Sequence, residues 1–176
     1  MQVLGLKGQK VSTVAVALLA FLTVGASSER TANLDDRLLA AHNRVRAQAG
    51  VPPLVWDDRL AGEAGLWGRH LSRVGHLVHS RDSSLNPQGE NLWAGTRGHY
   101  TPEMMVGLWA AERRHFRPGI FPINSRTGRL DDVGHYTQLI WRSTKRVGCA
   151  LIQGRHDEFL VCRYLEGGNV IGESPV

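Results

Sequence analysis

The chain has 176 residues, a formal net charge of +5 and 42% hydrophobic residues. This length suits one domain with a sizeable core, and the composition excludes a wholly disordered chain. Lysine and arginine form no continuous run and no ladder with aromatic residues, so the sequence does not favour nucleic-acid binding.

The first 26 residues are typical of a secretory signal peptide. Lys7 and Lys10 form a short basic region, Val11–Val24 is an apolar run, and Val24-Gly25-Ala26 supplies the small residues of a cleavage site. The apolar run is shorter than the ~20 residues that span a bilayer, so a membrane anchor is the less favoured interpretation. Cleavage after Ala26 leaves 150 of the 176 residues, and the loss of both lysines lowers the net charge from +5 to +3.

Two amphipathic helices are predicted next. The first begins after Asn33, which can cap it, and ends near Gly50, since Pro52-Pro53 forbids its continuation. Its apolar stripe consists of Leu34, Leu38, Ala41 and Val45. The second begins after a capping Asp57. Its stripe consists of Leu60, Ala64, Trp67 and Leu71.

The middle of the chain is predicted to contain a third helix between two loops. Gly75–His99 is rich in Gly, Ser and Asn and is expected to be irregular, which in a compact domain is usually a sign of function. Thr101-Pro102-Glu103 is a helix start, with a capping hydroxyl, an early proline and an acid in the first turn. Arg117–Val133 is predicted to be the second loop. The third helix, which begins at Thr101-Pro102-Glu103, is predicted to carry Met105, Leu108, Trp109 and Glu112 on its inward face.

Three polar features suggest chemistry. Glu112 shares its predicted face with apolar residues, so it needs a partner if it is buried; the alternative is an exposed carboxylate at the helix edge. The segment Gly89-Glu90-Asn91-Leu92 is a weak turn-like motif on its own. Gly134–Trp141 combines hydrogen-bonding and apolar groups, and its pattern fits both a short helix and a strand.

The two cysteines lie in a predicted hairpin near the C-terminus. Arg146–Gln153 and Glu158–Tyr164 are expected to be strands. If the turn is centred between residues 155 and 156, Cys149 faces Cys162, and export to an oxidising compartment favours a disulfide between them. Two buried free thiols are the alternative. Helices early and strands late predict an α+β fold with helices covering a sheet.

Several motifs together resemble the CAP superfamily of cysteine-rich secretory, antigen 5 and pathogenesis-related class 1 proteins. Gly134–Thr144 (GHYTQLIWRST) is similar to its first signature and Phe159–Val170 (FLVCRYLEGGNV) to its second. The Gly89–Leu92 motif, the pair Trp109 and Glu112, and the opening Ala41-His42-Asn43-x-x-Arg46 follow the family's order. The resemblance covers roughly Leu38 to Gly172.

The resemblance implies an α–β–α three-layer sandwich with a central, mainly antiparallel sheet. It also implies a cleft tetrad, carried over position by position to His79, Glu90, Glu112 and His135. The histidines would then be the expected partners of Glu112. His76 is a rival for the first histidine, but its distance from Gly89–Leu92 fits the family less well.

Together with the signal peptide, the resemblance divides the chain into four predicted segments. They are a signal peptide (1–26), an N-terminal extension with the start of the first helix (27–37), the CAP domain (38–172) and a short tail (173–176). Glu166 departs from the second signature, where proline or a basic residue is more frequent. The single cysteine pair and the lack of a cysteine-rich module resemble a bacterial member.

The residues favour binding over catalysis. The family implies a secreted, extracellular module, or a periplasmic one in a Gram-negative source, that acts as a monomer and takes a lipid, a sterol or a cell-surface ligand. His79 and His135 are candidate ligands of a divalent metal, with zinc preferred and no metal obligatory; the alternative is a purely structural tetrad. The competing function is a hydrolase with Ser80 as nucleophile beside the His/Glu groups, although the sequence contains neither GxSxG nor HExxH.

Overall fold

The computed structural model describes residues 29–81 and 87–176. The predicted signal peptide therefore lies outside the described residues and stays a prediction. The chain divides into two compact units, Met1–Ala32 and Asn33–Val176, and the second contains all the elements described below. Within the described ranges, no helix combines the length and the apolar character needed to cross a membrane.

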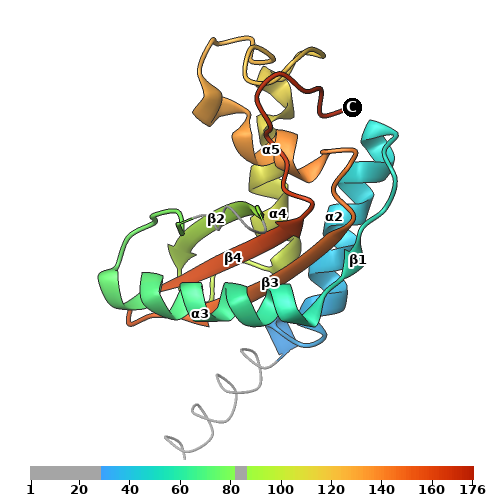
Figure 1. Cartoon of the computed structure of the whole chain (residues 1–176). Helices are drawn as coiled ribbons and strands as arrows, with labels where there is room; N and C mark the ends of the chain where they lie inside the picture. The colour runs from blue at the N-terminus through green and yellow to red at the C-terminus, as the bar shows by residue number, and fades with distance from the viewer. Residues whose placement is uncertain (1–28, 82–86) are drawn as a thin grey trace, which may run out of the picture. The chain divides into compact units, whose positions relative to one another are not determined.

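A four-stranded sheet forms the centre of the second unit, with strand order β1-β3-β4-β2 (Figure 1). Strand β1 runs parallel to β3, and the other two pairings are antiparallel, so the sheet is mainly antiparallel as predicted. The strands are β1 (Val55–Trp56), β2 (Gly89–Thr96), β3 (Arg146–Gln153) and β4 (Asp157–Leu165).

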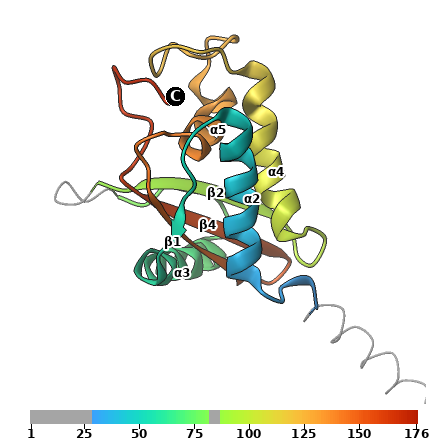
Figure 2. The ribbon, with the colours of Figure 1, turned by 90° about the vertical axis from the view of Figure 1, so that its right-hand side faces the viewer.

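Helices cover both faces of the sheet and make it the middle layer of a three-layer sandwich (Figure 2). Helix α3 lies along one face, and α2, α4 and α5 lie on the other. The predicted α+β sandwich is therefore confirmed. The helices are α2 (Leu34–Ala49), α3 (Asp58–Val74), α4 (Pro102–Ala110) and α5 (Gly134–Leu139), with two short 3-10 helices, η1 (Ala111–His115) and η2 (Leu130–Asp132).

Side chains of β4 alternate between the two layers, as the period-2 geometry of a strand requires. Phe159 and Val161 pack with Ala64 and Leu71 of α3. Leu160, Cys162 and Tyr164 belong to the larger core on the other face. That core also contains Leu38, Met105, Trp109 and Leu139 from the three helices.

Local capping signals explain where most helices begin and end. The Asp57 side chain accepts from the backbone N–H groups of Arg59 and Leu60, and Thr101 accepts from Met104 N, as predicted. Gly50 closes α2 with φ of 70°, a conformation that glycine adopts without steric cost. Asn33 does stand at the N-cap of α2, but its side chain makes no capping hydrogen bond, so that part of the prediction is wrong.

Two expectations for the middle of the chain are also wrong. Gly75–His99 was expected to be irregular, yet it contains β2, whose full length pairs with β4. Leu108 was assigned to the inward face of its helix, but it is half exposed. Leu108 lies within the α-helix at the edge of the buried face formed by Met105 and Trp109, while Glu112 follows the end of that helix at Ala110 and belongs to η1. The ambiguous Gly134–Trp141 segment contains helix α5, which ends at Leu139.

The C-terminal hairpin confirms the cysteine prediction. Strands β3 and β4 pair antiparallel with Cys149 directly opposite Cys162, and a disulfide joins them. Both cysteines are buried in the core between the sheet and helix α2. The disulfide therefore fixes the register of the two central strands beneath the candidate site.

Candidate functional site

The first His/Glu pair joins the segment after α3 to strand β2. His79 Nδ1 lies 2.7 Å from Glu90 Oε1, which also accepts from the backbone N–H of Ser80 at 3.1 Å. The Ser80 hydroxyl donates to the other oxygen at 2.9 Å, and Arg163 Nη2 lies 3.4 Å from it. Only 8% of the Glu90 side chain is exposed, so these contacts compensate a nearly buried carboxylate.

The second pair joins η1 to the start of α5. Glu112 Oε2 accepts from the backbone N–H groups of His135 at 2.9 Å and Tyr136 at 3.1 Å, and Oε1 lies 2.6 Å from His135 Nδ1. Val133, the N-cap residue of α5, provides no side-chain cap. Glu112 therefore caps α5 from another element, because a carboxylate satisfies the free N–H groups of a helix N-terminus and suits its positive end.

Both imidazoles are oriented in the same manner. An ionised carboxylate only accepts hydrogen bonds, so the Nδ1 atoms of His79 and His135 carry the donated protons. In the neutral form of each ring, the Nε2 lone pair remains available for a ligand or a metal ion. The tetrad thus consists of two matched carboxylate–imidazole pairs.

In the first pair, protonated His79 and ionised Glu90 stabilise each other. The hydrogen bond to Glu90 raises the pKa of His79 against the opposing effect of burial. Burial alone would raise the pKa of Glu90, but the hydrogen bonds from His79 and Ser80, together with the charge of Arg163, outweigh it and lower that pKa.

A cleft of about 700 Å³ contains three of the four tetrad residues on its wall: His79, Glu90 and His135. Glu112 reaches this cleft through its contact with His135. The rest of the wall is mainly apolar and includes Leu77, Val78, Leu92, Phe121, Leu130 and Ile171. A smaller polar pocket of about 210 Å³ shares His79, Glu90 and Asn169 with the cleft. The rival His76 is exposed, and its Nδ1 contacts the backbone oxygen of Val74.

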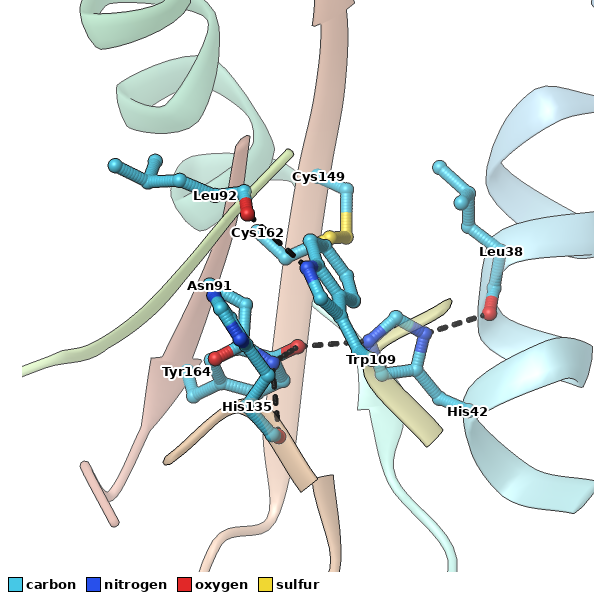
Figure 3. Close-up of a disulfide and its surroundings, with 9 residues drawn as sticks. All are labelled: Leu38, His42, Asn91, Leu92, Trp109, His135, Cys149, Cys162 and Tyr164. Atoms are coloured by element: carbon cyan, nitrogen blue, oxygen red, sulfur yellow. Dashed lines mark hydrogen bonds between the residues drawn. A yellow bond between two sulfur atoms is a disulfide. The ribbon is translucent and has the colours of Figure 1, made fainter. Parts of the chain in front are cut away.

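A buried hydrogen-bond chain connects His135 to helix α2 (Figure 3). His42 Nδ1 lies 2.8 Å from the Leu38 carbonyl oxygen, which can only accept, so His42 Nε2 accepts from the Tyr164 hydroxyl at 2.9 Å. Asn91 Nδ2 donates to the Tyr164 oxygen at 3.3 Å and to the His135 carbonyl at 3.1 Å. Burial lowers the pKa of His42 to about 4, which keeps this ring neutral.

Trp109 completes the support. Its ring is stacked on His135, with ring centres 6.0 Å apart and an angle of 13° between the planes, and its edge meets His42. The indole N–H donates to the Leu92 carbonyl at 3.0 Å. The sequence motifs contain His42, Asn91 and Trp109, but none of the three is predicted to take part in the site. Nothing in the sequence spacing of these three residues shows that they meet next to His135.

The donor set of the tetrad fits a divalent cation, since two imidazoles with carboxylate-bound Nδ1 atoms are typical of His ligands. The tetrad does not form a preassembled cluster of three close ligand atoms. Over the described ranges, the only such group within 4.8 Å is His42 with Cys149 and Cys162. The two sulfurs are joined in the disulfide, so that group is not a metal site.

Comparisons with known proteins identify the family of this chain. Residues 39–164 match the cysteine-rich secretory protein family (CAP). The chain is 38% identical over 160 residues to pathogenesis-related protein 1C of Nicotiana tabacum, covering 90% of this chain and 89% of the relative. It is 35% identical over 136 residues to pathogenesis-related protein 1 of Arabidopsis thaliana, covering 77% and 78%.

Solved structures share the fold at lower identity. The crystal structure of NaASP2 with Zn²⁺ is similar with a TM-score of 0.69 and 19% identity, covering 80% of this chain and 83% of NaASP2. The Schistosoma mansoni venom allergen-like protein 4 is similar with a TM-score of 0.56 and 20% identity, covering 80% and 90%.

Proposed function

Because the chain belongs to the cysteine-rich secretory protein family, we propose that it is a secreted binding module that holds a lipid or sterol in the His/Glu cleft and a divalent cation on His79 and His135. The observation that carries this proposal is the cleft itself. Apolar side chains from several separate segments line it, and so do both imidazoles.

The apolar wall supports lipid binding. A volume of about 700 Å³ is within the range of small-molecule sites, which are usually apolar with a few polar groups that orient the ligand. Leu77, Val78 and Leu130 are each more than 40% exposed, so a bound hydrocarbon would remove their surface from water. The adjoining polar pocket at His79 and Glu90 suits a hydroxyl or a charged headgroup.

The oriented imidazoles support cation binding. Two Nε2 atoms are fewer firm ligands than a closed four-ligand site provides, so affinity should be modest and water should complete the coordination. Glu90 and Glu112 hold the rings in place and increase their basicity as ligands. The structure of the similar NaASP2 was determined with Zn²⁺, which makes zinc the first cation to test.

A hydrolase is less well supported by the same contacts. The Ser80 hydroxyl donates to Glu90 rather than to an imidazole. The pKa of Glu90 is lowered, and a carboxylate with a lowered pKa is a weak general base at neutral pH. We therefore propose that Ser80 holds Glu90 in place.

Lipid binding is tested with delipidated protein and a monomeric fluorescent sterol. Val78→Glu places a charge on the apolar wall and should weaken binding about tenfold or more, about 1.4 kcal/mol. Leu66→Glu, at an exposed position of α3 outside the cleft, is the matched control and should bind as the parent does. Equal affinity of the parent and Val78→Glu would contradict a lipid in this cleft.

Cation binding is tested by titrating zinc into the protein in a calorimeter. His135→Ala and His79→Ala each remove a proposed ligand and should weaken binding more than Glu112→Gln, which leaves both rings in place. Affinity should also fall as the pH drops, because protonated imidazoles cannot bind a metal, and the fall should begin above the ordinary histidine pKa of ~6.5, since that of His79 is raised. His76→Ala is the control. Unchanged affinity in His79→Ala and His135→Ala would place the metal elsewhere.

A further inference from the structure

A hairpin-like loop stands at the end of the domain, next to the cleft. Its two sides are joined by a bridge between Phe116 and Ser125 and by the hydrogen bond from Arg117 N to Asn124 O at 2.9 Å. Two of the tip residues, Ile120 and Ile123, are 49% and 70% exposed. Figure 1 shows this loop at one end of the molecule, beyond the sheet.

The loop is held firmly despite these exposed residues. Phe121, between the two isoleucines, is buried and packs edge-on against Trp141 with ring centres 6.2 Å apart. Its backbone exchanges hydrogen bonds with the C-terminal segment, from Phe121 N to Glu173 O at 2.8 Å and from Gly172 N to Phe121 O at 2.9 Å. The exposed aliphatic side chains are therefore presented by a fixed backbone.

Two further exposed aliphatic residues lie near Phe121. Ile171 is 79% exposed and Leu130 is 43% exposed, and both line the cleft together with Phe121. We call these four residues the apolar rim: Ile120, Ile123, Leu130 and Ile171. Clustered exposed aliphatic side chains usually mark an interaction site. Two members of the apolar rim, Leu130 and Ile171, belong to the wall of the proposed lipid cleft.

Positive charge accompanies the apolar rim. Both the Nε and Nη2 atoms of Arg117 donate to the Ile123 carbonyl, and Arg126 Nε donates to the Phe116 carbonyl. Among the ion pairs of residues 29–81 and 87–176, none involves Arg117 or Arg126, so their charges are uncompensated. The exposed carboxylate next to the rim, Asp131, is paired with Arg129 instead. Exposed aliphatic groups beside uncompensated arginines are the combination that suits an anionic lipid surface.

We propose that the apolar rim inserts into the surface of an anionic phospholipid bilayer while Arg117 and Arg126 contact its phosphate groups. The mouth of the cleft then faces the membrane. The inference rests on the proposed function, because it identifies the bilayer as the source of the lipid that the cleft takes up.

Cosedimentation with vesicles tests the proposal on the mature protein. The parent should bind vesicles that contain phosphatidylglycerol, and binding should weaken in 0.5 M salt and on pure phosphatidylcholine, because salt screens the arginine–phosphate attraction. The double variant Ile123→Ser/Ile171→Ser should bind about tenfold more weakly, since it removes the two most exposed aliphatic groups.

Leu66→Ser is the matched control, because Leu66 is an aliphatic residue on α3 that is 64% exposed. It should bind vesicles as the parent does. Parent-like binding by the double variant, or an equal loss in Leu66→Ser, would overturn the proposal. A concentration-dependent dimer that the double variant abolishes, without vesicle binding by the parent, would assign the rim to self-association and would also overturn it.

The monomeric-sterol assay separates this inference from the proposed function. If the parent binds anionic vesicles through the rim but no monomeric sterol, the membrane contact stands and the lipid-binding cleft fails. If it takes up monomeric sterol but binds no vesicles, the cleft stands and the membrane contact fails.

Discussion

At the scale of single residues, the titration of His79 and Glu90 makes the stability of the fold depend on pH. The pKa of His79 is raised, so its contribution to stability is complete below the unfolded value of ~6.5 and is lost as the pH rises through the raised value. The pKa of Glu90 is lowered, so its contribution is complete above ~4.3 and is lost as the pH falls through the lowered value. The pair therefore stabilises the fold most between about pH 4.3 and 6.5.

Glu90→Gln tests this assignment. The substitution removes the charge that favours protonated His79, so the pKa of His79 measured by NMR should move down towards its ordinary value. The loss in thermal stability should be larger at pH 6 than at pH 9. The His76 signal in the same spectra is an internal reference that should not change. A His79 titration that is identical in both proteins would contradict the contact.

Buried Arg46 shows how one residue can organise a region remote from it in sequence. Its guanidinium donates to the carbonyl oxygens of Pro52, Leu139, Trp141 and Thr144 at 2.6–3.1 Å. Burial lowers its pKa to about 10, so it stays charged at neutral pH. Arg46 thus ties helix α2 to the end of α5, the helix that presents His135.

At the scale of elements, α3 approaches β3 closely at its N-terminal end. A Cβ atom at Gly148 would meet the backbone at Asp57 O, Ala61 N and Leu60 C, the last at 2.7 Å. Backbone atoms cannot move aside as a flexible side chain can. Helix α3 can therefore lie against the sheet only because residue 148 has no side chain.

Gly148→Ala should destabilise the domain by about 3 kcal/mol or more, because relief of the clash must displace α3 from the sheet. Gly62→Ala is the control within the same helix, since a Cβ atom there meets nothing within 4 Å. That control should stabilise the protein by up to about 1 kcal/mol through higher helix propensity. Urea denaturation of both variants provides the comparison; equal stabilities would contradict the close packing.

At the scale of the whole molecule, export and oxidation are linked. A buried disulfide between two central strands is typical of proteins in oxidising compartments, and the signal peptide predicted from the sequence would direct the chain to one. The oxidised domain should also retain its strand register when it is transiently opened, because Cys149 and Cys162 stay opposed.

Intact mass of the exported protein tests both features. The mature chain should begin near Ser27, and treatment with reductant should add the mass of two hydrogen atoms. Removing the disulfide should cost about 3 kcal/mol of stability, the entropy expected for closing a loop of this length. Retention of residues 1–26, or alkylation of both thiols without reductant, would contradict the corresponding prediction.

Features set by local chemistry could be predicted from the sequence alone. Capping residues such as Asp57 and Thr101 act on neighbouring backbone groups, so their positions mark helix starts directly. The opposition of Cys149 and Cys162 follows from the symmetry of a tight hairpin. The resemblance to a family supplied the tetrad residues, which no spacing argument could have connected.

Only the tertiary structure decided the features that depend on distant partners. Strand β2 is buried on both faces over Asn91–Trp93, so it lacks the alternation that marks a strand, and pairing with β4 determines its conformation. Glu112 was ambiguous because its partners, the N–H groups of α5, lie more than 20 residues away. A hydrogen bond between remote segments leaves no periodic trace in either one, since each segment forms its half of the contact only after the core has brought them together.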